Sequence, residues 1–315
     1  MEKPVLYIVV PCYNEEEVLE ETNRQLCALL GTMMAEGQVS AESRLLYVDD
    51  GSRDATWSLI ERFHGQTAMV CGVKLAANSG HQRALLAGLY ASKSHSDIMV
   101  SIDADLQDDI GVIPDMVSAY ARGCDVVYGV RRRRTTDTFF KRFTAQSFYR
   151  VMGFLGVKTV YNHADFRLMS RRAVEELFRY KERNLFLRGL VPLIGYPSDV
   201  VYYDRKERLA GESKYPLRKM LSFAAEGITS FSVQPLHLLL YLGAIFILVS
   251  LLIFCYVIYR YITHDVVPGW ASLILSVWFV GGCVLVGLGI VGEYVGKIYI
   301  EAKGRPRFNI EKELL

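Results

Sequence analysis

The stretch IMVSIDAD, residues 98–105, is a short, mainly apolar run that ends abruptly at two acidic residues. Runs of this length and composition are typical of a strand that is buried on both faces of a sheet. Asp103 and Asp105 follow the strand directly, and carboxylates at this spacing form a hard-oxygen site that suits Mg²⁺ or Mn²⁺. Any acidic turn supplies the same pattern, so the interpretation of this pair depends on the sequence around it.

The surrounding sequence repeats this arrangement of a buried strand followed by polar residues. Over residues 1–210, β-rich runs alternate with helical patterns, which predicts an α/β domain with a parallel sheet. Ligands of such open sheets bind beyond the carboxyl ends of the strands, so we expect the site along that edge. The predicted strands are residues 5–10, 44–48, 69–74, 98–102 and 125–129, and the polar runs 13–15, 49–52, 78–81, 103–105 and 131–134 follow them.

The composition argues against two kinds of partner. The chain has 315 residues and a formal net charge of +2, which is too small to indicate a nucleic-acid partner. Its six cysteines are scattered, without a C-x-x-C pair or the histidine spacing of a zinc site. We therefore expect reduced thiols, no zinc centre and no nucleic-acid partner.

Two long segments near the C-terminus, residues 227–259 and 266–292, contain no Asp, Glu, Lys or Arg. Each is longer than the roughly 20 apolar residues that cross a bilayer core. Within residues 233–299 we expect two transmembrane helices, near 235–260 and 268–293. The preceding residues 211–232 carry apolar side chains at helical spacing, which predicts a juxtamembrane amphipathic segment. An ordinary core-facing helix fits that spacing equally well.

Basic residues flank the two predicted spans on the same side. Arg218 precedes the first span and Lys297 follows the second, whereas the short connection between the spans holds only Arg260 as a basic residue. The positive-inside rule therefore places the N-terminal domain, residues 1–210, and the tail, residues 300–315, in the cytoplasm.

Four motifs together resemble those of family 2 glycosyltransferases. Within that family the chain is most similar to the polyprenyl-phosphate branch, the dolichol-phosphate mannose synthases and bacterial bactoprenol-phosphate glucosyltransferases, and the resemblance covers essentially the whole chain. Asp108-Asp109 departs from the family pattern, which usually continues with prolines. The motifs are VPCYNE at 10–15, DDGSRD at 49–54, DADLQ at 103–107 and GESKY at 211–215.

The resemblance implies a GT-A fold, followed by interfacial helices and a C-terminal hairpin of two transmembrane helices. It implies transfer of a sugar, with inversion, from a nucleotide sugar to polyprenyl (undecaprenyl) phosphate at the cytoplasmic face of a bacterial inner (plasma) membrane. The motifs do not identify the sugar, and UDP is favoured over GDP as its nucleotide. Gly292-x-x-x-Gly296 allows close packing of helices, so a homo-oligomer is also considered.

The resemblance assigns Pro11, Tyr13 and Glu15 to the pocket for the nucleotide base and ribose, and Asp50 to a contact with the base or ribose. From the residues alone, Glu15 fits an acid at a helix start equally well. The loop residues 78–80 likewise fit a simple turn.

The resemblance also gives roles to residues around the diphosphate. Asp103 is expected to hold the ribose or sugar, Asp105 the Mg²⁺ or Mn²⁺ ion, and Gln107 the metal or the sugar side. Arg208 and Lys214 are expected to counter the diphosphate charge in a segment that closes over it, although a basic linker beside the membrane would contain the same residues. The expected donor-binding set is Pro11, Tyr13, Glu15, Asp50, Gly80, Gln82, Asp103, Ala104, Gln107, Arg208 and Lys214, and the expected metal ligands are Asp105, Asp103 and Gln107.

At the acceptor end, Arg131 is the first of four consecutive arginines and is expected to bind the acceptor phosphate, with Arg142 and Ser147 as further candidates. Guanidinium groups suit this task because they bind phosphate oxygens bidentately, but an arginine run also fits a solvated basic face or a contact with anionic lipid. Asp165 is expected to be catalytic, together with Asp105 and Arg131. A lipid monophosphate has a second pKa of about 6, so orientation suits Asp165 at least as well as proton removal.

Two other functions are weighed against this one. The first is a family 2 transferase with another acceptor, a polysaccharide or another lipid. Processive synthases usually carry Gln-x-x-Arg-Trp and more spans, and none of Trp57, Trp270 and Trp278 follows an arginine. The second is a non-catalytic membrane scaffold on an inactive transferase domain, against which the retained Asp103 and Asp105 argue. Metal-dependent turnover of a donor separates the scaffold from both enzymes.

Overall fold

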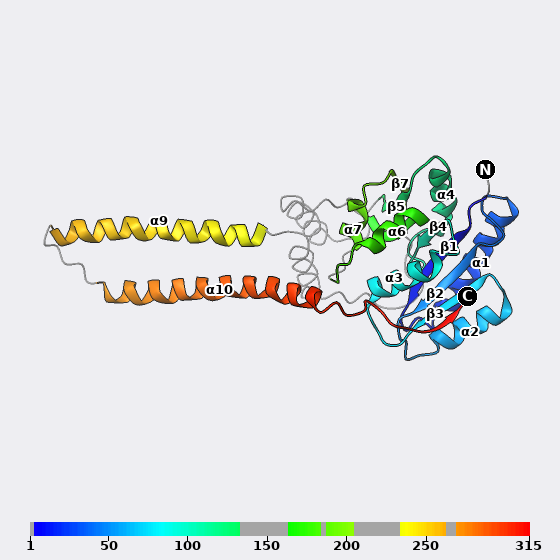
Figure 1. Ribbon diagram of the computed structural model, residues 1–315, viewed down its shortest axis with the longest axis horizontal. Helices are drawn as coiled ribbons and strands as arrows, with labels where there is room; N and C mark the ends of the chain where they lie inside the picture. Colours follow the sequence, from blue (N-terminus) through cyan, green and yellow to red (C-terminus); the bar gives the residue numbers. More distant parts are fainter. Residues whose placement is uncertain (1–2, 133–162, 184–186, 205–233, 263–268) are drawn as a thin grey trace. The chain divides into compact units, whose positions relative to one another are not determined.

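The computed structural model describes residues 3–132, 163–183, 187–204, 234–262 and 269–315 (Figure 1). The described residues divide into two compact units: residues 3–132, 163–183, 187–204 and 305–315 belong to the first, and residues 234–262 and 269–304 belong to the second. The first unit contains the predicted catalytic domain together with the C-terminal end of the chain, and the second contains both predicted transmembrane helices.

The first unit is built on an eight-stranded mixed sheet, whose strand order is β7-β5-β6-β4-β1-β2-β3-β8. Strands β4, β1, β2 and β3 are parallel to one another, as predicted, and β5 and β7 form a second parallel pair. β6 and β8 run antiparallel to their neighbours, and neither of these strands nor β7 was predicted. The strands are β1 Leu6–Cys12, β2 Arg44–Asp49, β3 Val70–Leu75, β4 Ile98–Ser101, β5 Val126–Arg131, β6 His163–Ser170, β7 Ser198–Tyr203 and β8 Ile310–Leu314.

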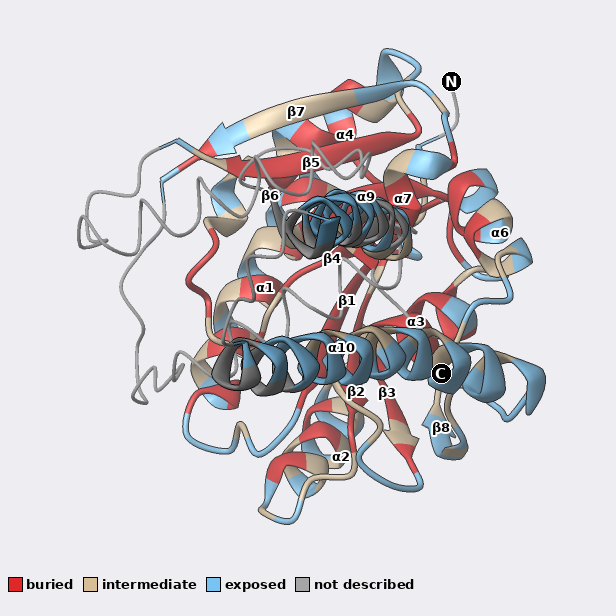
Figure 2. Cartoon of the chain, turned by 90° about the vertical axis from the view of Figure 1, so that its left-hand side faces the viewer, coloured by how far each residue is buried: buried red, intermediate tan, exposed pale blue. Residues whose placement is uncertain are grey.

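All five predicted strands are present, and their ends lie within two residues of the predicted ends. They were recognisable because each is a mainly apolar run; every residue of β1 is buried, and Figure 2 shows the central strands as buried. The described residues thus confirm an α/β domain of the GT-A class. Its helices are α1 Leu19–Ala35, α2 Thr56–Gln66, α3 His81–Ser92, α4 Ile113–Ala121 after the 3₁₀ turn η1 Ile110–Val112, α6 Arg171–Arg179 and α7 Leu187–Leu193.

Helix α3 packs closely on β1 and β2 through Gly88. A Cβ atom added at Gly88 would lie 2.3 Å from Val9 Cγ1 and 2.7 Å from Val48 Cγ2, so a larger residue fits only if the neighbours shift. This close approach fixes the distance of α3 from the sheet. It thereby fixes the position of His81 and Gln82, the first two residues of the helix.

The last residues of the chain return to the sheet of the first unit. Strand β8, Ile310–Leu314, pairs antiparallel with β3 and forms one edge of the sheet. Just before it, the Asn309 carbonyl accepts a hydrogen bond from Ala76 N–H at 2.9 Å. The prediction of residues 300–315 as a tail did not include this strand, because three consecutive charged residues at its centre hide any apolar alternation.

The second unit contains two long helices, α9 (Gln234–Ile262) and α10 (Trp270–Ala302), at the positions of the predicted spans. Among the described residues, one helical segment, Phe279–Ala302, is long and apolar enough to cross a membrane by length and composition. The hairpin of two spans therefore stays a prediction. The predicted amphipathic segment, residues 211–232, lies outside the described residues.

Replacement of Gly88 by alanine tests the packing of α3 on the sheet. The added methyl group would meet Val9 and Val48, and overpacking of a core costs about 1–3 kcal/mol of stability. We expect Gly88→Ala to lower the melting temperature in detergent by about 5 °C, measured by differential scanning fluorimetry. Gly31→Ala in α1 is the matched control, because no atom lies within 4 Å of its added Cβ, and it should keep or raise the melting temperature. A wild-type melting temperature for Gly88→Ala would contradict the packing argument.

Candidate active site

The loops after β1 and β2 are joined by hydrogen bonds at the carboxyl edge of the sheet. Asn14 N–H donates to Ser52 Oγ at 3.0 Å, and Arg53 N–H donates to Asn14 Oδ1 at 2.9 Å. These contacts hold Asn14 at a φ of +53°, which asparagine tolerates better than most residues. Of the neighbouring residues predicted to bind the donor, Tyr13 is exposed and Pro11 is buried within β1. Tyr13 therefore lies in a loop whose conformation is fixed by hydrogen bonds to the neighbouring loop.

Asp50, directly after β2, anchors the loop that leads into α3. Its carboxylate oxygens accept hydrogen bonds from Ser79 N–H at 2.7 Å and Gly80 N–H at 2.9 Å, and its side chain is buried. Burial raises the pKa of Asp50, while the two N–H donors act in the opposite direction. Gly80 has a φ of +92°, a conformation that favours glycine. Asp50 thus fixes the shape of this loop, and its contact with a base or ribose stays a prediction.

The acidic loop after β4 is held in a strained shape. Leu106 has a φ of +50°, in the left-handed region that bulky residues rarely adopt. The Ala104 carbonyl accepts a hydrogen bond of 2.6 Å from the buried Thr22 hydroxyl. Asp105 Oδ1 accepts a hydrogen bond of 3.2 Å from Gln107 N–H. Together these contacts fix the direction in which the acidic pair leaves the sheet.

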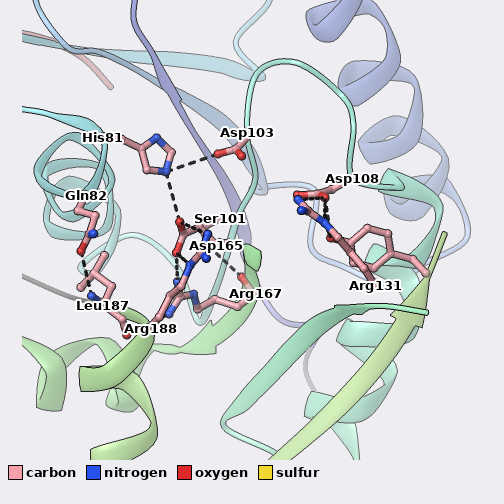
Figure 3. A network of polar contacts seen from close by, with 11 residues as sticks. His81, Gln82, Ser101, Asp103, Asp108, Arg131, Asp165, Arg167, Leu187 and Arg188 are labelled. Atoms are coloured by element: carbon pink, nitrogen blue, oxygen red, sulfur yellow. Dashed lines mark hydrogen bonds and ion pairs between the residues drawn. The ribbon is translucent and has the colours of Figure 1, made fainter. Parts of the chain in front are cut away.

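Asp103 is surrounded by other ionisable groups. Burial raises the pKa of Asp103 to about 6, although His81 acts in the opposite direction. The negative charges of Asp165, Asp108 and Asp105 add to the rise. His81 Nε2 lies 3.5 Å from Asp103 Oδ1 and 3.9 Å from Asp165 Oδ2, so the imidazole stands between the two carboxylates (Figure 3). This concentration of carboxylates favours the binding of a cation.

The acidic pair fits a Mg²⁺ or Mn²⁺ ion that the substrate helps to bind. Within the part of the chain that the structure describes, no group of three or more His, Cys, Asp or Glu side chains is arranged to hold a metal. Protein sites for Mg²⁺ commonly use one or two carboxylates, with substrate phosphate oxygens and water as the other ligands. Asp103 and Asp105 match that pattern, and a cation would relieve the repulsion around Asp103. Gln107, the third predicted ligand, is buried in the same loop.

Arg131, at the end of β5, is held by two side chains that the sequence analysis did not assign. Its Nη2 and Nε donate to Asp108 Oδ1 at 2.9 and 3.3 Å, and its Nε also donates to the Tyr203 hydroxyl at 3.2 Å. The Tyr203 hydroxyl in turn donates to Asp108 Oδ1 at 2.5 Å. Asp108 and Tyr203 are buried, whereas 24% of the Arg131 side chain is exposed. The network therefore presents a guanidinium group of fixed orientation at the edge of the sheet.

Asp165, near the start of β6, is held by two arginines. Arg167 Nη2 donates to Asp165 Oδ1 at 2.6 Å, and Arg188 donates through Nε to Oδ1 at 3.3 Å and through Nη2 to Oδ2 at 3.2 Å (Figure 3). Burial by itself would raise the pKa of Asp165, but the charges of Arg188 and Arg167 outweigh it and hold the pKa well below its ordinary value. Asp165 is therefore a carboxylate at neutral pH and a weak proton acceptor.

The other predicted residues fall into two groups. Glu15 lies in the loop after β1, where its N–H donates to Thr56 Oγ1 at 2.9 Å, and Gln82 Oε1 accepts a hydrogen bond of 2.9 Å from Leu187 N–H. The second group lies outside the described residues and consists of Arg142, Ser147, Arg208 and Lys214.

Five residues of the site were not assigned from the sequence. His81 ends the polar run 78–81, and Arg167 lies two residues after Asp165, so both are close in sequence to residues that were assigned. Arg188 and Tyr203 had no local signal, because their partners lie 23 and 95 residues away along the chain. The complete group is His81, Asp108, Arg167, Arg188 and Tyr203.

Known proteins to which this chain is similar include several glycosyltransferases. A family model described as "Glycosyl transferase family 2" matches residues 7–178. The chain is 54% identical over 312 residues to an uncharacterized glycosyltransferase, YkoT, of Bacillus subtilis (strain 168), covering 99% of this chain and 93% of the relative. It is 39% identical to the SfII prophage-derived bactoprenol glucosyl transferase of Shigella flexneri, covering 97% of each chain. The mannosyltransferase PcManGT of Pyrobaculum calidifontis, solved with GDP-Man and Mn²⁺, matches with a TM-score of 0.48 and 17% identity, covering 96% of this chain and 86% of the other.

Asp165→Asn tests the charge balance around Asp165. Removing one partner of a buried ion pair costs about 3–5 kcal/mol. Arg167, whose side chain is 2% exposed, would lose its closest countercharge. Because the pKa of Asp165 is lowered in the folded protein, its stabilising effect is present above the unfolded value of about 4 and is lost as the pH falls further. We therefore expect Asp165→Asn to unfold at lower denaturant concentration than the wild type at neutral pH, and the gap to narrow below about pH 4.

Asp199→Asn is the control for this experiment. It breaks an exposed pair with Arg122 of 3.1 Å, and it should change the free energy of unfolding by less than about 1 kcal/mol at every pH. A stability gap between Asp165→Asn and the wild type that does not change with pH would contradict the proposed charge balance.

Proposed function

This chain belongs to glycosyl transferase family 2, and we propose that it transfers a sugar from a nucleotide sugar to a polyprenyl phosphate. The observation that carries the proposal is the order of β4, β6 and β5 as neighbours in the sheet. The acidic pair follows β4, Asp165 lies near the start of β6, and Arg131 ends β5, so groups suited to a cation, an acceptor and a phosphate share one edge. The 39% identity to a bactoprenol glucosyl transferase, over nearly the full length, supports a lipid phosphate as the acceptor.

The donor in this proposal is a UDP-sugar. A Mg²⁺ or Mn²⁺ ion held by Asp103, Asp105 and Gln107 would neutralise the diphosphate and stabilise the charge that develops on the leaving nucleotide. Arg208 and Lys214 would add positive charge that counters the diphosphate. The residues of the site do not determine which sugar is transferred, so hexoses and amino sugars are compared by experiment.

The reaction in this proposal is a single displacement with inversion at the anomeric carbon. An oxygen of the lipid phosphate forms the new bond to that carbon, while the bond from the carbon to the nucleotide diphosphate breaks and the diphosphate leaves with the electron pair. The lipid phosphate has a second pKa of about 6 and is mostly a dianion at neutral pH, so no proton has to be removed. This agrees with Asp165, whose carboxylate is already engaged by two arginines. Asp165 then orients the acceptor, and Arg131 aligns its phosphate.

The proposed location is a bacterial inner membrane, with two spans and with the catalytic unit in the cytoplasm. Phe279–Ala302 supports one span. Helix α9, which has no charged residue between Gln234 and Tyr259, is the proposed second span. The long apolar chain of a polyprenyl lipid stays in the bilayer, so its phosphate has to be reached at the membrane surface. An enzyme anchored in the membrane meets that requirement.

A transfer assay with the full-length protein in detergent tests the proposed reaction. The assay offers undecaprenyl phosphate and a panel of radiolabelled UDP- and GDP-sugars, with Mg²⁺, Mn²⁺ or EDTA. We expect label in the organic phase only with the wild type and a metal. Asp105→Ala should reduce transfer by about a hundredfold or more, because a metal supplies several kcal/mol of transition-state stabilisation. Asp115→Ala, which removes an exposed carboxylate from the first turn of α4, is the control and should keep wild-type activity.

Each alternative function gives a different result in this assay. Label in a water-soluble polymer would indicate another acceptor, and nucleotide binding without any turnover would indicate a scaffold. Failure of every donor to label the lipid, with nucleotide binding intact, would contradict the polyprenyl-phosphate acceptor. Label from a single donor would identify both the sugar and the nucleotide.

Reporter fusions test the proposed location. Alkaline phosphatase folds into an active enzyme only outside the cytoplasm, and the basic residues flanking the spans favour cytoplasmic ends. A fusion after Asp265 should therefore be active, and a fusion after Leu315 should be inactive. Equal activity of the two fusions would contradict the two-span arrangement.

A further inference from the structure

The first two residues of α7 contact three residues of the site. Leu187 N–H donates to Gln82 Oε1 at 2.9 Å, and Arg167 Nη1 donates to the Leu187 carbonyl at 3.3 Å. The next residue, Arg188, donates to both carboxylate oxygens of Asp165 (Figure 3). Helix α7 is thereby attached to the start of α3 through Gln82 and to β6 through Arg167 and Asp165.

The two arginines that hold Asp165 differ in burial and in geometry. Arg167 is 2% exposed and reaches only Oδ1 of this carboxylate, at 2.6 Å. Arg188 is 34% exposed and reaches Oδ1 and Oδ2 with two different nitrogens, at 3.3 and 3.2 Å. Such a forked pair of hydrogen bonds fixes the plane of the carboxylate and also compensates its negative charge. Both arginines compensate the charge of Asp165, Arg167 from the buried side, and Arg188 in addition sets the orientation of the carboxylate from the accessible side.

We propose that Arg188 is a positioning residue for Asp165, and that α7 keeps this carboxylate aligned with the start of α3. The proposal rests on the proposed transferase function, in which Asp165 orients the acceptor. Apart from Arg188, the described ion pair of Asp165 Oδ2 is with His81 Nε2 at 3.9 Å, which is beyond hydrogen-bonding distance. The single hydrogen bond from Arg167 then leaves the carboxylate able to turn about its Cβ–Cγ bond. Misplacement of an orienting group by about 1 Å can cost on the order of a hundredfold in rate.

The test compares Arg188→Gln and Arg188→Lys with the wild type in detergent. Release of nucleotide diphosphate is measured as a function of donor concentration, with undecaprenyl phosphate and metal present. Arg188→Gln should lower kcat by about 10- to 100-fold and change the KM for the donor by less than about threefold, because donor binding does not use this residue. Arg188→Lys keeps the positive charge, but an ammonium group cannot donate the paired hydrogen bonds of a guanidinium. The kcat of this variant should therefore stay at least about tenfold below that of the wild type.

Arg171→Gln is the matched control. Arg171 pairs with Asp97 at 3.1 Å, with side chains 44% and 41% exposed, and it follows the last residue of β6, at the other end of the strand from Asp165. Its loss removes an arginine–aspartate pair of comparable length, and kcat should stay at the wild-type value. The melting temperature of Arg188→Gln should match that of Arg171→Gln, because Arg167 still compensates the charge of Asp165.

Three results would overturn the positioning role of Arg188. They are a wild-type kcat in Arg188→Gln, full recovery of kcat in Arg188→Lys, and a melting temperature or nucleotide affinity of Arg188→Gln well below that of the Arg171→Gln control. The role of Arg188 can be tested separately from the identity of the acceptor. For this purpose, release of nucleotide diphosphate is also measured without the lipid, where water is the acceptor. Donor hydrolysis without lipid product in the wild type would contradict the lipid acceptor, and the effect of the Arg188 variants on hydrolysis would then decide the role of Arg188. Absence of any turnover in the wild type would contradict both proposals.

Discussion

Negative charge buried at one edge of the sheet is the constraint on which the rest of the site depends. A carboxylate taken away from water is costly unless donors or cations surround it, so each acidic side chain at this edge requires a partner. Asp50 has two backbone N–H groups, Asp108 has one arginine and Asp165 has two. Asp103 faces a histidine instead, and burial raises its pKa, whereas at Asp165 the arginines outweigh burial and lower it. Among these four carboxylates, Asp103 is the one without an arginine or backbone N–H partner in the hydrogen bonds and ion pairs described, so added positive charge is favourable there. That carboxylate is one of those proposed to bind the metal.

The antiparallel direction of β6 explains how a carboxylate from a later part of the sequence reaches the same edge. β6 lies between β4 and β5 and runs opposite to both, so its first residues lie beside the last residues of its neighbours. Ser101 at the end of β4 is paired with Arg167, and Val130 near the end of β5 is paired with His163. A parallel strand at this place would carry Asp165 to the opposite edge of the sheet. The direction of one strand, rather than the acidic motif alone, brings the acidic pair, the Arg131 guanidinium and Asp165 together.

The parts of the fold that the sequence predicted are those whose side chains report burial directly. The five strands that were predicted, β1 to β5, are almost entirely buried and mainly apolar, so the loops that follow them have a predictable place at the sheet edge. Three strands were missed: β6, because HADFRLMS contains a charged residue at a buried position; β7, a partly exposed edge strand that begins with two polar residues; and β8, because IEKEL is mainly charged. The residues of the site likewise fall into those that the sequence predicted and those that it did not. Asp103 and Asp105 adjoin a predicted strand, whereas Arg188 and Tyr203 matter through partners that are distant in the sequence. Arg167 shows the limit most clearly, since no local pattern indicates that an arginine is almost completely buried.

The return of the chain to the sheet at β8 makes the two long helices an insertion within the catalytic unit rather than an appendage that follows it. The chain leaves the sheet after β7, forms α9 and α10, and re-enters beside β3. Without β8, strand β3 would present unpaired backbone groups at an exposed edge, whereas the charged β8 ends the sheet with a strand that resists further pairing. The first unit is thus continuous in sequence with the helices at two points, after β7 and before β8. The sheet is therefore completed only after both helices have been synthesised, so the edge of the catalytic fold depends on the segments proposed to enter the membrane.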